Sequence, residues 1–396
     1  MRLNRAQPLP IGLDIGHSSV KAIQLRADQE HLSVIASARE SITEPLPADG
    51  VDRVEALTDL LRGIRRSGGF YGRGAVIALP PDLVHTKNMR LPPMPESELA
   101  SAVDFEARTV FPFSAESAVT RFIRAGEVRQ GTELKQEVIV FGAPRDPIDR
   151  LVEVVHRTGF NVESIDLSSC ALFRCVDRFA RRAADQTEVH VMLDIGCHHT
   201  TVIIGRGREL GFVKTIDVGV EPINEAVAAK LSISVDEARQ LRRRLAEPGR
   251  PPDSVASAVY DVVRAVLEPL GREVALCLRY YSVTFRGQRP AQVRVYGGGG
   301  TDPQVIDALS GALTIPVTSG RPLSGVGNCE LFDDGADAPL SEWAIAFGLA
   351  LRMTEGPFVP GPGNALSAPR RSTAEVIDLD SVIATEPLET KEAVHA

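Results

Sequence analysis

The chain has 396 residues, of which 43% are apolar and 24% are charged, a composition typical of a soluble globular protein with two or three domains. Its formal net charge of −8 gives no electrostatic case for binding nucleic acid. Five cysteines without paired spacing suit a reducing compartment better than a disulfide framework. There is no apolar signal-peptide core and no stretch long enough for a membrane span, so we expect a cytoplasmic protein without direct membrane insertion.

A four-residue motif, Leu-Asp-Ile-Gly, occurs twice in the chain. It occupies residues 13–16 and again 193–196, each time at the end of an apolar run typical of a buried strand. Two further strand-like runs and then a helix follow each copy, the helices lying near residues 54–64 and 223–231. This duplicated strand-strand-strand-helix unit is stronger evidence than the tetrapeptide, because a single Asp-x-Gly also occurs in ordinary turns.

The chemistry of the two motifs points to a polyphosphate. A strand that turns at Asp-x-Gly presents a carboxylate and free backbone N–H groups at its tip, and the glycine lets the backbone approach a ligand. Nearby hydroxyl groups can add donors. Two such tips facing each other would hold a polyphosphate and its metal ion, and we predict that they converge on one nucleotide cleft. A glycine run at 297–300, between a strand-like segment and a helix near 303–313, would let a flat nucleoside lie against bare backbone, although alone it is a weak indication.

Residues 85–160 do not continue the pattern of the first unit, and we interpret them as a small α+β subdomain inserted into the first half. The helix near 96–110 mixes Leu99, Val103 and Phe105 with charged residues, so we expect one side of it to face a core. The aromatic turn at its end, Phe111-Pro112-Phe113, either seals that core or forms part of a groove for a short peptide.

The rest of the chain divides around this insertion. We expect residues 10–84 with 161–188 to form the first subdomain and residues 189–353 to form the second half, with a helical part at about 222–290. After residue 353 a linker rich in proline and glycine leads into an acidic tail, and we expect residues 354–396 to be disordered.

Taken together, these features resemble the actin-like ATPase superfamily, an α/β fold with two duplicated halves around a nucleotide cleft. Within it, the sequence resembles the PilM family of type IV pilus assembly proteins. The resemblance lies in DIGHSSVKAIQL, RLPPMPESEL, FEARTVFPF and AIAFGLALR, and it covers about residues 10–352. It implies a cytoplasmic ATP-binding scaffold, peripheral at the inner membrane, that recruits the N-terminal cytoplasmic peptide of a PilN-like inner-membrane protein. Pilus motor ATPases are a further class of partner that it allows.

The resemblance also implies a set of ligand contacts, with ATP and Mg²⁺ as cofactors. Asp14 and Asp194 would hold the magnesium ion, through its waters, because this ion sheds water reluctantly. The remaining cofactor-binding positions are Gly16, Ser18, Ser19 and Lys21 on one side of the phosphates, Gly196, Thr200 and Thr201 on the other, and Gly297, Gly298 and Gly299 along the adenosine.

Several positions depart from the family pattern. His17 and the run Cys197-His198-His199 replace residues that are usually small. The run is a poor metal site, because three adjacent residues cannot all face one ion and no partner cluster is evident in the sequence. Related ATPases carry a glutamate at the position of Arg239, so we expect weak nucleoside binding and predict that Arg239→Glu tightens it. No residue can be named that activates a water, so the sequence indicates nucleotide binding and names no machinery for hydrolysis.

Two other functions of the same fold stay open. A small-molecule kinase would need a general-base carboxylate in the cleft, whereas the inserted segment offers carboxylates only on an amphipathic helix. A cell-division adaptor resembling FtsA would end in a basic amphipathic membrane helix. The residues from Ser372 onward instead carry six acidic side chains and one lysine.

Overall fold

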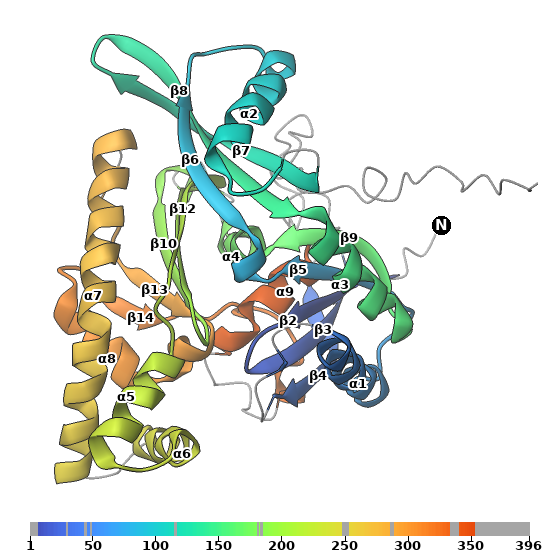
Figure 1. Ribbon diagram of the computed structural model, residues 1–396, viewed down its shortest axis with the longest axis vertical. Coiled ribbons are helices and arrows are strands. Elements are labelled where there is room, and N and C mark those ends of the chain that lie inside the picture. Colours follow the sequence, from blue (N-terminus) through green and yellow to red (C-terminus); the bar gives the residue numbers. More distant parts are fainter. Residues whose placement is uncertain are drawn as a thin grey trace, which may run out of the picture.

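The computed structural model describes residues 7–352, apart from gaps at 29–30, 43–45, 48–49, 115–116, 180–181, 183–184, 248–252, 286–288 and 333–339. In this part of the chain two α/β lobes lie side by side, and a smaller third sheet stands above them (Figure 1). The predicted linker and acidic tail, residues 354–396, lie outside the described residues.

The sheet of the first lobe has the strand order β4-β3-β2-β5-β9, with the short β1 also paired to β3. β2, β3 and β4 form an antiparallel meander, and β5 and β9 continue the sheet parallel to β2. Helices cover both faces, which is why β2 and β5 are apolar along almost their whole length. The strands are β1 (Gln7–Pro8), β2 (Ile11–Ile15), β3 (Ser19–Ala27), β4 (Leu32–Ser41), β5 (Gly74–Leu79) and β9 (Asn161–Leu167).

Four helices pack against this sheet. On one face, α1 and α3 lie against each other and the sheet, and α1 buries Leu57, Leu61 and Ile64 at helical spacing before it ends at Gly68. On the other face, α4 and α9 lie against each other. The helices are α1 (Val51–Ser67), α3 (Arg145–Arg157), α4 (Ser168–Asp177) and α9 (Ala344–Ala350).

The second lobe repeats the first. Its strand order, β12-β11-β10-β13-β14, matches β4-β3-β2-β5-β9 position for position, so the predicted duplication is confirmed. The long α7 and α8 pack together beside this sheet, and α5 and α6 extend below it (Figure 1). The elements are β10 (Val189–Ile195), β11 (Thr200–Arg206), β12 (Glu209–Ile216), β13 (Val293–Tyr296), β14 (Val317–Ser319), α5 (Glu221–Leu231), α6 (Val235–Leu245), α7 (Ser254–Phe285) and α8 (Pro303–Ala312).

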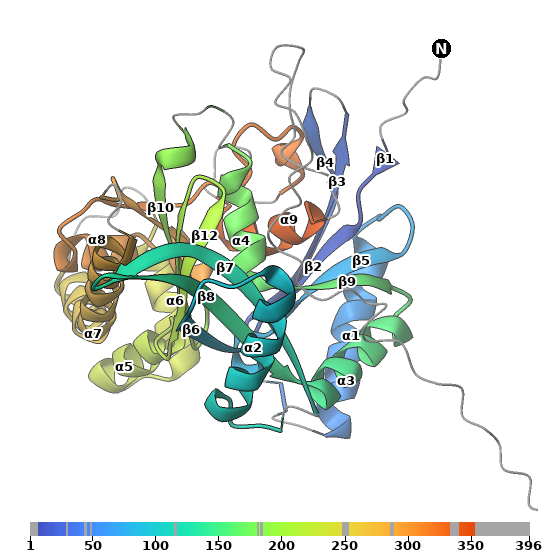
Figure 2. The same ribbon diagram turned by 90° about the horizontal axis from the view of Figure 1, so that it is seen from above.

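The third sheet belongs to the inserted segment and has the order β6-β8-β7. Its strands are β6 (His85–Leu91), β7 (Ala118–Gln130) and β8 (Glu133–Pro144), and α2 (Glu96–Val110) covers one face. The other face packs on β12 and α7, so a segment inserted into the first lobe rests on the second. Seen from above, β7 and β8 cross from the first lobe towards α7 (Figure 2).

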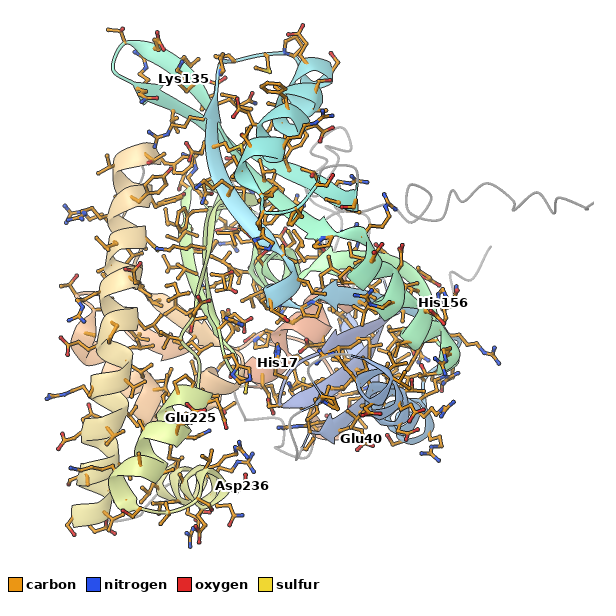
Figure 3. All side chains as sticks on the ribbon, in the orientation of Figure 1. His17, Glu40, Lys135, His156, Glu225 and Asp236 are labelled. Atoms are coloured by element: carbon orange, nitrogen blue, oxygen red, sulfur yellow. The ribbon has the colours of Figure 1, made fainter. Side chains whose placement is uncertain are left out.

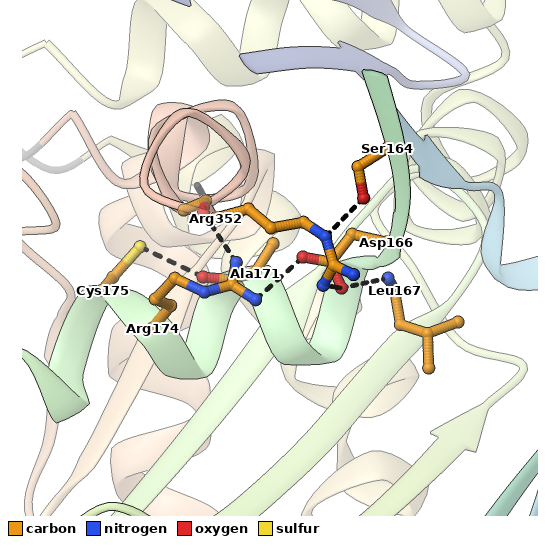
Figure 4. Close-up of polar contacts among 8 residues, drawn as sticks. Ser164, Asp166, Leu167, Ala171, Arg174, Cys175 and Arg352 are labelled. Atoms are coloured by element: carbon orange, nitrogen blue, oxygen red, sulfur yellow. Dashed lines mark hydrogen bonds and ion pairs between the residues drawn. The ribbon is translucent and has the colours of Figure 1, made fainter. Parts of the chain in front are cut away.

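An ion-pair network fixes α9 beneath the first sheet. The Asp166 carboxylate is fully buried at the end of β9 and accepts from Arg174 of α4 at 2.9 Å, while the Arg352 guanidinium lies 3.4 Å away (Figure 4). Arg174 also donates to the Gly348 carbonyl of α9, and Arg352 donates to the Ser164 hydroxyl. Two arginines around one buried carboxylate leave it paired, as a buried charge requires.

Two helices pack differently from the sequence-based division. α3 was grouped with the insertion, residues 85–160, but it packs on α1 and β9, so the inserted sheet ends at Pro144. α9 was grouped with the second half, but its close packing on β2 places it against the first lobe: a Cβ on Gly12 would lie 1.9 Å from the Ala346 carbonyl oxygen. The remaining domain boundaries stay a prediction.

Candidate nucleotide site

The two Asp-x-Gly motifs form the same turn in both lobes. After β2, the Gly16 N–H donates to the Ser19 carbonyl at 3.1 Å, and after β10 the Gly196 N–H donates to the His199 carbonyl at 2.9 Å. Each turn leads directly into the next strand, β3 or β11. A Cβ on Gly16 would approach the Ser19 carbonyl to 2.9 Å, so the tight first turn explains the glycine there.

The carboxylates of the two turns are close enough for the charge of one to affect the other. Both Asp14 and Asp194 are buried. Burial, and next the neighbouring Asp14, raise the pKa of Asp194 to about 7. Burial also raises the pKa of Asp14, while Lys21 lowers it. Two buried acids that disfavour each other's charge are suited to share a cation. The predicted convergence of the two tips is therefore found.

The hydroxyl groups around the carboxylates differ in their availability. Among the described residues, the buried Ser19 hydroxyl has no hydrogen-bond partner, so it is free to meet a ligand. Ser18 is exposed. Thr200, in contrast, donates to the Val218 carbonyl at 2.6 Å, which commits its proton to holding the loop after β12. Thr201 stands opposite Asp194 in the ladder, as Lys21 stands opposite Asp14.

The glycine run lies beside the second turn. Gly297 has a φ of 72°, and a Cβ there would lie 2.6 Å from the Asp194 carboxylate, so only glycine fits. A Cβ on Gly299 would lie 2.6 Å from the Ile195 side chain, whereas nothing lies within 4 Å of one on Gly298. The run therefore packs on β10 through two glycines and leaves Gly298 open to a ligand. Its contact with adenosine stays a prediction.

Two arginines of α6, Arg239 and Arg242, are already paired. Arg239 bonds Glu221 at the start of α5 at 2.7 Å and Asp236 at 2.6 Å. That Arg239→Glu tightens nucleotide binding stays a prediction, and a glutamate there would also lie beside the Glu221 carboxylate. The buried Arg242, which the sequence analysis did not single out, bonds Asn224 and Asp302 and so ties α5 and α6 to the end of the glycine run.

The structure also brings together three histidines that the sequence left apart. The His17 ring lies 5.2 Å from His198 and 6.4 Å from His199, centroid to centroid. The run Cys197-His198-His199 thus has His17, from the matching turn of the other lobe, beside it. In the described part of the chain, no group of three histidines, cysteines or acids is placed to hold a metal ion.

In the insertion, Phe111 takes the core role of the two that the sequence left open, and Phe105 does not take the core role expected of it. Phe111 is buried, stacks on Phe113 at 5.3 Å and packs where a Cβ on Gly142 would touch both rings, so it belongs to the core under α2. Phe105, expected on the core side, is 68% exposed. The buried side of α2 is instead formed by Leu99, Val103 and Ala107.

Comparison with known proteins identifies the family. The sequence matches the family model described as type IV pilus assembly protein PilM over residues 12–354. The chain belongs to the PilM family. A solved structure of a PilM-PilN type IV pilus biogenesis complex has a TM-score of 0.71 at 23% identity, over 87% of this chain and 98% of that one. The ethanolamine utilization protein EutJ from Carboxydothermus hydrogenoformans has a TM-score of 0.51 at 16% identity, over 87% and 92% of the two chains.

A distant sequence relative extends the comparison. The cell division protein FtsA of Streptococcus pneumoniae is 22% identical over 276 residues, which span 64% of this chain and 60% of that protein. The predicted actin-like fold of two duplicated halves is confirmed, and the chain has the architecture of PilM family members. In the part of the chain that the structure describes, no helix is both long and apolar enough to cross a membrane.

Proposed function

We propose that this PilM family member binds ATP with Mg²⁺ between its two lobes and acts as a nucleotide-dependent scaffold of type IV pilus assembly. The convergence of Asp14 and Asp194, two buried acids with raised pKa values, is the observation that carries the proposal. Two further observations support the proposal. The buried Ser19 hydroxyl has no hydrogen-bond partner among the described residues, and the glycines beside β10 let the backbone approach a ligand.

Each group has a distinct task in this proposal. Magnesium, when bound, would neutralise phosphate charge, and Asp14 and Asp194 would hold it through its waters. The Nζ of the buried Lys21 lies 4.0 Å from the Glu342 carboxylate. With a nucleotide present, this ammonium group would form an ion pair with the phosphates. The backbone N–H groups of the two turns and the Ser19 hydroxyl would donate to phosphate oxygens. Binding rather than hydrolysis is proposed.

The partner is proposed from the family. A relative of similar fold is described in complex with PilN, and we propose that this chain likewise holds the N-terminal cytoplasmic peptide of a PilN-like inner-membrane protein, which would bring it to that membrane. The exposed Phe105 on α2 is a suitable anchor, because rigid aromatic side chains contribute strongly to peptide binding. The inserted sheet carries this helix and also rests on the second lobe, one of the two lobes between which ATP is proposed to bind.

A calorimetric titration with ATP tests the nucleotide part. Wild type should bind ATP more tightly with Mg²⁺ than with a chelator, and Asp14→Asn should weaken the Mg²⁺-dependent binding by roughly 10–100-fold, as for other groups that act through metal-bound water. Asp59→Asn, whose side chain is 78% exposed on α1, serves as the matched control. Equal binding with and without Mg²⁺, or no binding to folded wild type, would contradict the proposal.

A further inference from the structure

Three imidazole rings lie close together at the tips of the two Asp-x-Gly turns. His17 follows Gly16 in the first turn, and His198 and His199 follow Gly196 in the second. The rings of His198 and His199 are 6.4 Å apart, and each lies edge-on to His17. Figure 3 shows His17 between the two lobes, at the point where they approach each other. No part of the function described so far uses these side chains.

We propose that His17, His198 and His199 form a histidine clamp. The protonated rings bind the polyphosphate of the nucleotide, so that nucleotide binding takes up protons. The inference rests on the proposed nucleotide binding and adds to it three contacts and a proton linkage. An imidazolium ring donates from both nitrogens and carries a positive charge, whereas a neutral ring offers one donor. Opposed rings in the two turns could donate to the same phosphate group from either side.

The surroundings of His17 disfavour its charged form until an anion arrives. Burial, chiefly, lowers the pKa of His17, and His198, His199 and Arg53 lower it further, while Asp82, 3.9 Å away, raises it. His199 has the Asp217 carboxylate 3.2 Å from Nδ1, but that carboxylate is 93% exposed and therefore well screened. A polyphosphate placed among the rings would bring negative charge close to His17 and raise the pKa of that ring.

The same contacts allow an opposite role, which a substitution can distinguish. Because the rings already touch across the gap between the turns, they could instead obstruct the phosphates. In a clamp, smaller side chains at these positions weaken nucleotide binding and remove its pH dependence. In an obstruction, smaller side chains tighten binding at every pH. The sign of the effect therefore separates the two roles.

The experiment is a calorimetric titration of the full chain with ATP and Mg²⁺ between pH 6 and pH 8, in paired buffers of different ionisation enthalpy. For each proton taken up, linkage requires affinity to rise by about tenfold per unit fall in pH. The double variant His17→Ala/His198→Ala should bind less tightly at pH 6 and lose most of this slope. Protonation of the free ATP phosphates contributes equally in all samples, so it cancels in the comparison of wild type with the variants. His31→Ala, an exposed ring at the tip between β3 and β4, is the control and should behave as wild type.

Each outcome decides the matter. The same proton uptake in wild type and in the folded double variant would overturn the inference and leave the proposed nucleotide binding intact. Tighter binding by the double variant at all pH values would also overturn it, because the rings would then obstruct the site. Absence of ATP binding by folded wild type at every pH would overturn the proposed function, and the clamp with it. Thermal melts of each variant confirm that it is folded.

Discussion

At the scale of single residues, the raised pKa of Asp194 makes the stability of the fold depend on pH. Its pKa rises from 3.8 to about 7 on folding, because of burial first and then Asp14. Between those two values the folded chain holds a proton that the unfolded chain has released. The contribution of this group to stability therefore falls as pH rises through that window, and the loss is complete above about pH 7.

Removing the charge should reverse this loss. We expect Asp194→Asn to raise the Tm of the nucleotide-free protein at pH 8 by roughly 2–4 °C, with a smaller gain at pH 5. Differential scanning calorimetry at the two pH values measures it. Asp59→Asn on the surface of α1 should change neither value by much. A gain at pH 5 as large as at pH 8 would show that Asp194 is not the group that titrates.

Some residues of the candidate site could be predicted from a local sequence pattern, and others could not. Asp14 and Asp194 could be predicted, because each belongs to a repeated motif at the end of an apolar strand. The pairing of His17 with His198 could not, because it depends on two turns of different lobes touching. The ion pair of Arg239 with Glu221 could not be predicted either, because the two residues lie on different helices.

At the scale of elements, α2 shows why an apolar residue in a helix need not face the core. Leu99, Val103 and Ala107 are spaced by four and bury one side. Phe105 is two residues from Val103, roughly 200° around the helix, and so points away from the sheet. The small Ala107 gave little indication of the buried side. Likewise, sequence order could not show that α3 and α9 pack on the first lobe, since distant segments supply their contacts.

Substitutions in α2 and at the residue that follows it should separate core from surface. We expect Phe111→Ala to lower the free energy of unfolding by roughly 3–5 kcal/mol, because it leaves a cavity against Gly142 and Phe113. Phe105→Ala should change it by no more than about 0.5 kcal/mol, but should weaken binding of a PilN-like peptide. Chemical denaturation and fluorescence anisotropy measure the two effects. Full peptide affinity in Phe105→Ala would exclude this side of α2 as the anchor.

At the scale of the whole molecule, the insertion and the second lobe are joined by a polar contact. The Glu137 carboxylate of β8 is almost fully buried, and it accepts from Arg90 of β6 at 2.9 Å and from the Tyr280 hydroxyl of α7 at 2.6 Å. Arg90 also donates to Thr284 at 3.0 Å. A movement of the second lobe would therefore move the insertion, although the insertion interrupts the first lobe in sequence.

This contact should couple the two proposed ligands. If ATP changes how the lobes approach each other, the change reaches α2 through Glu137 and Tyr280, and peptide must alter ATP affinity by the same factor in return. We expect Tyr280→Phe, which removes one hydrogen bond to a buried carboxylate, to reduce that factor while each ligand alone still binds. The measurement is peptide affinity with and without ATP and Mg²⁺ in wild type and variant. Tyr260→Phe, near the opposite end of α7, is the matched control. An unchanged factor in Tyr280→Phe would mean that the lobes communicate with the insertion by another route, such as the packing of β7 on β12.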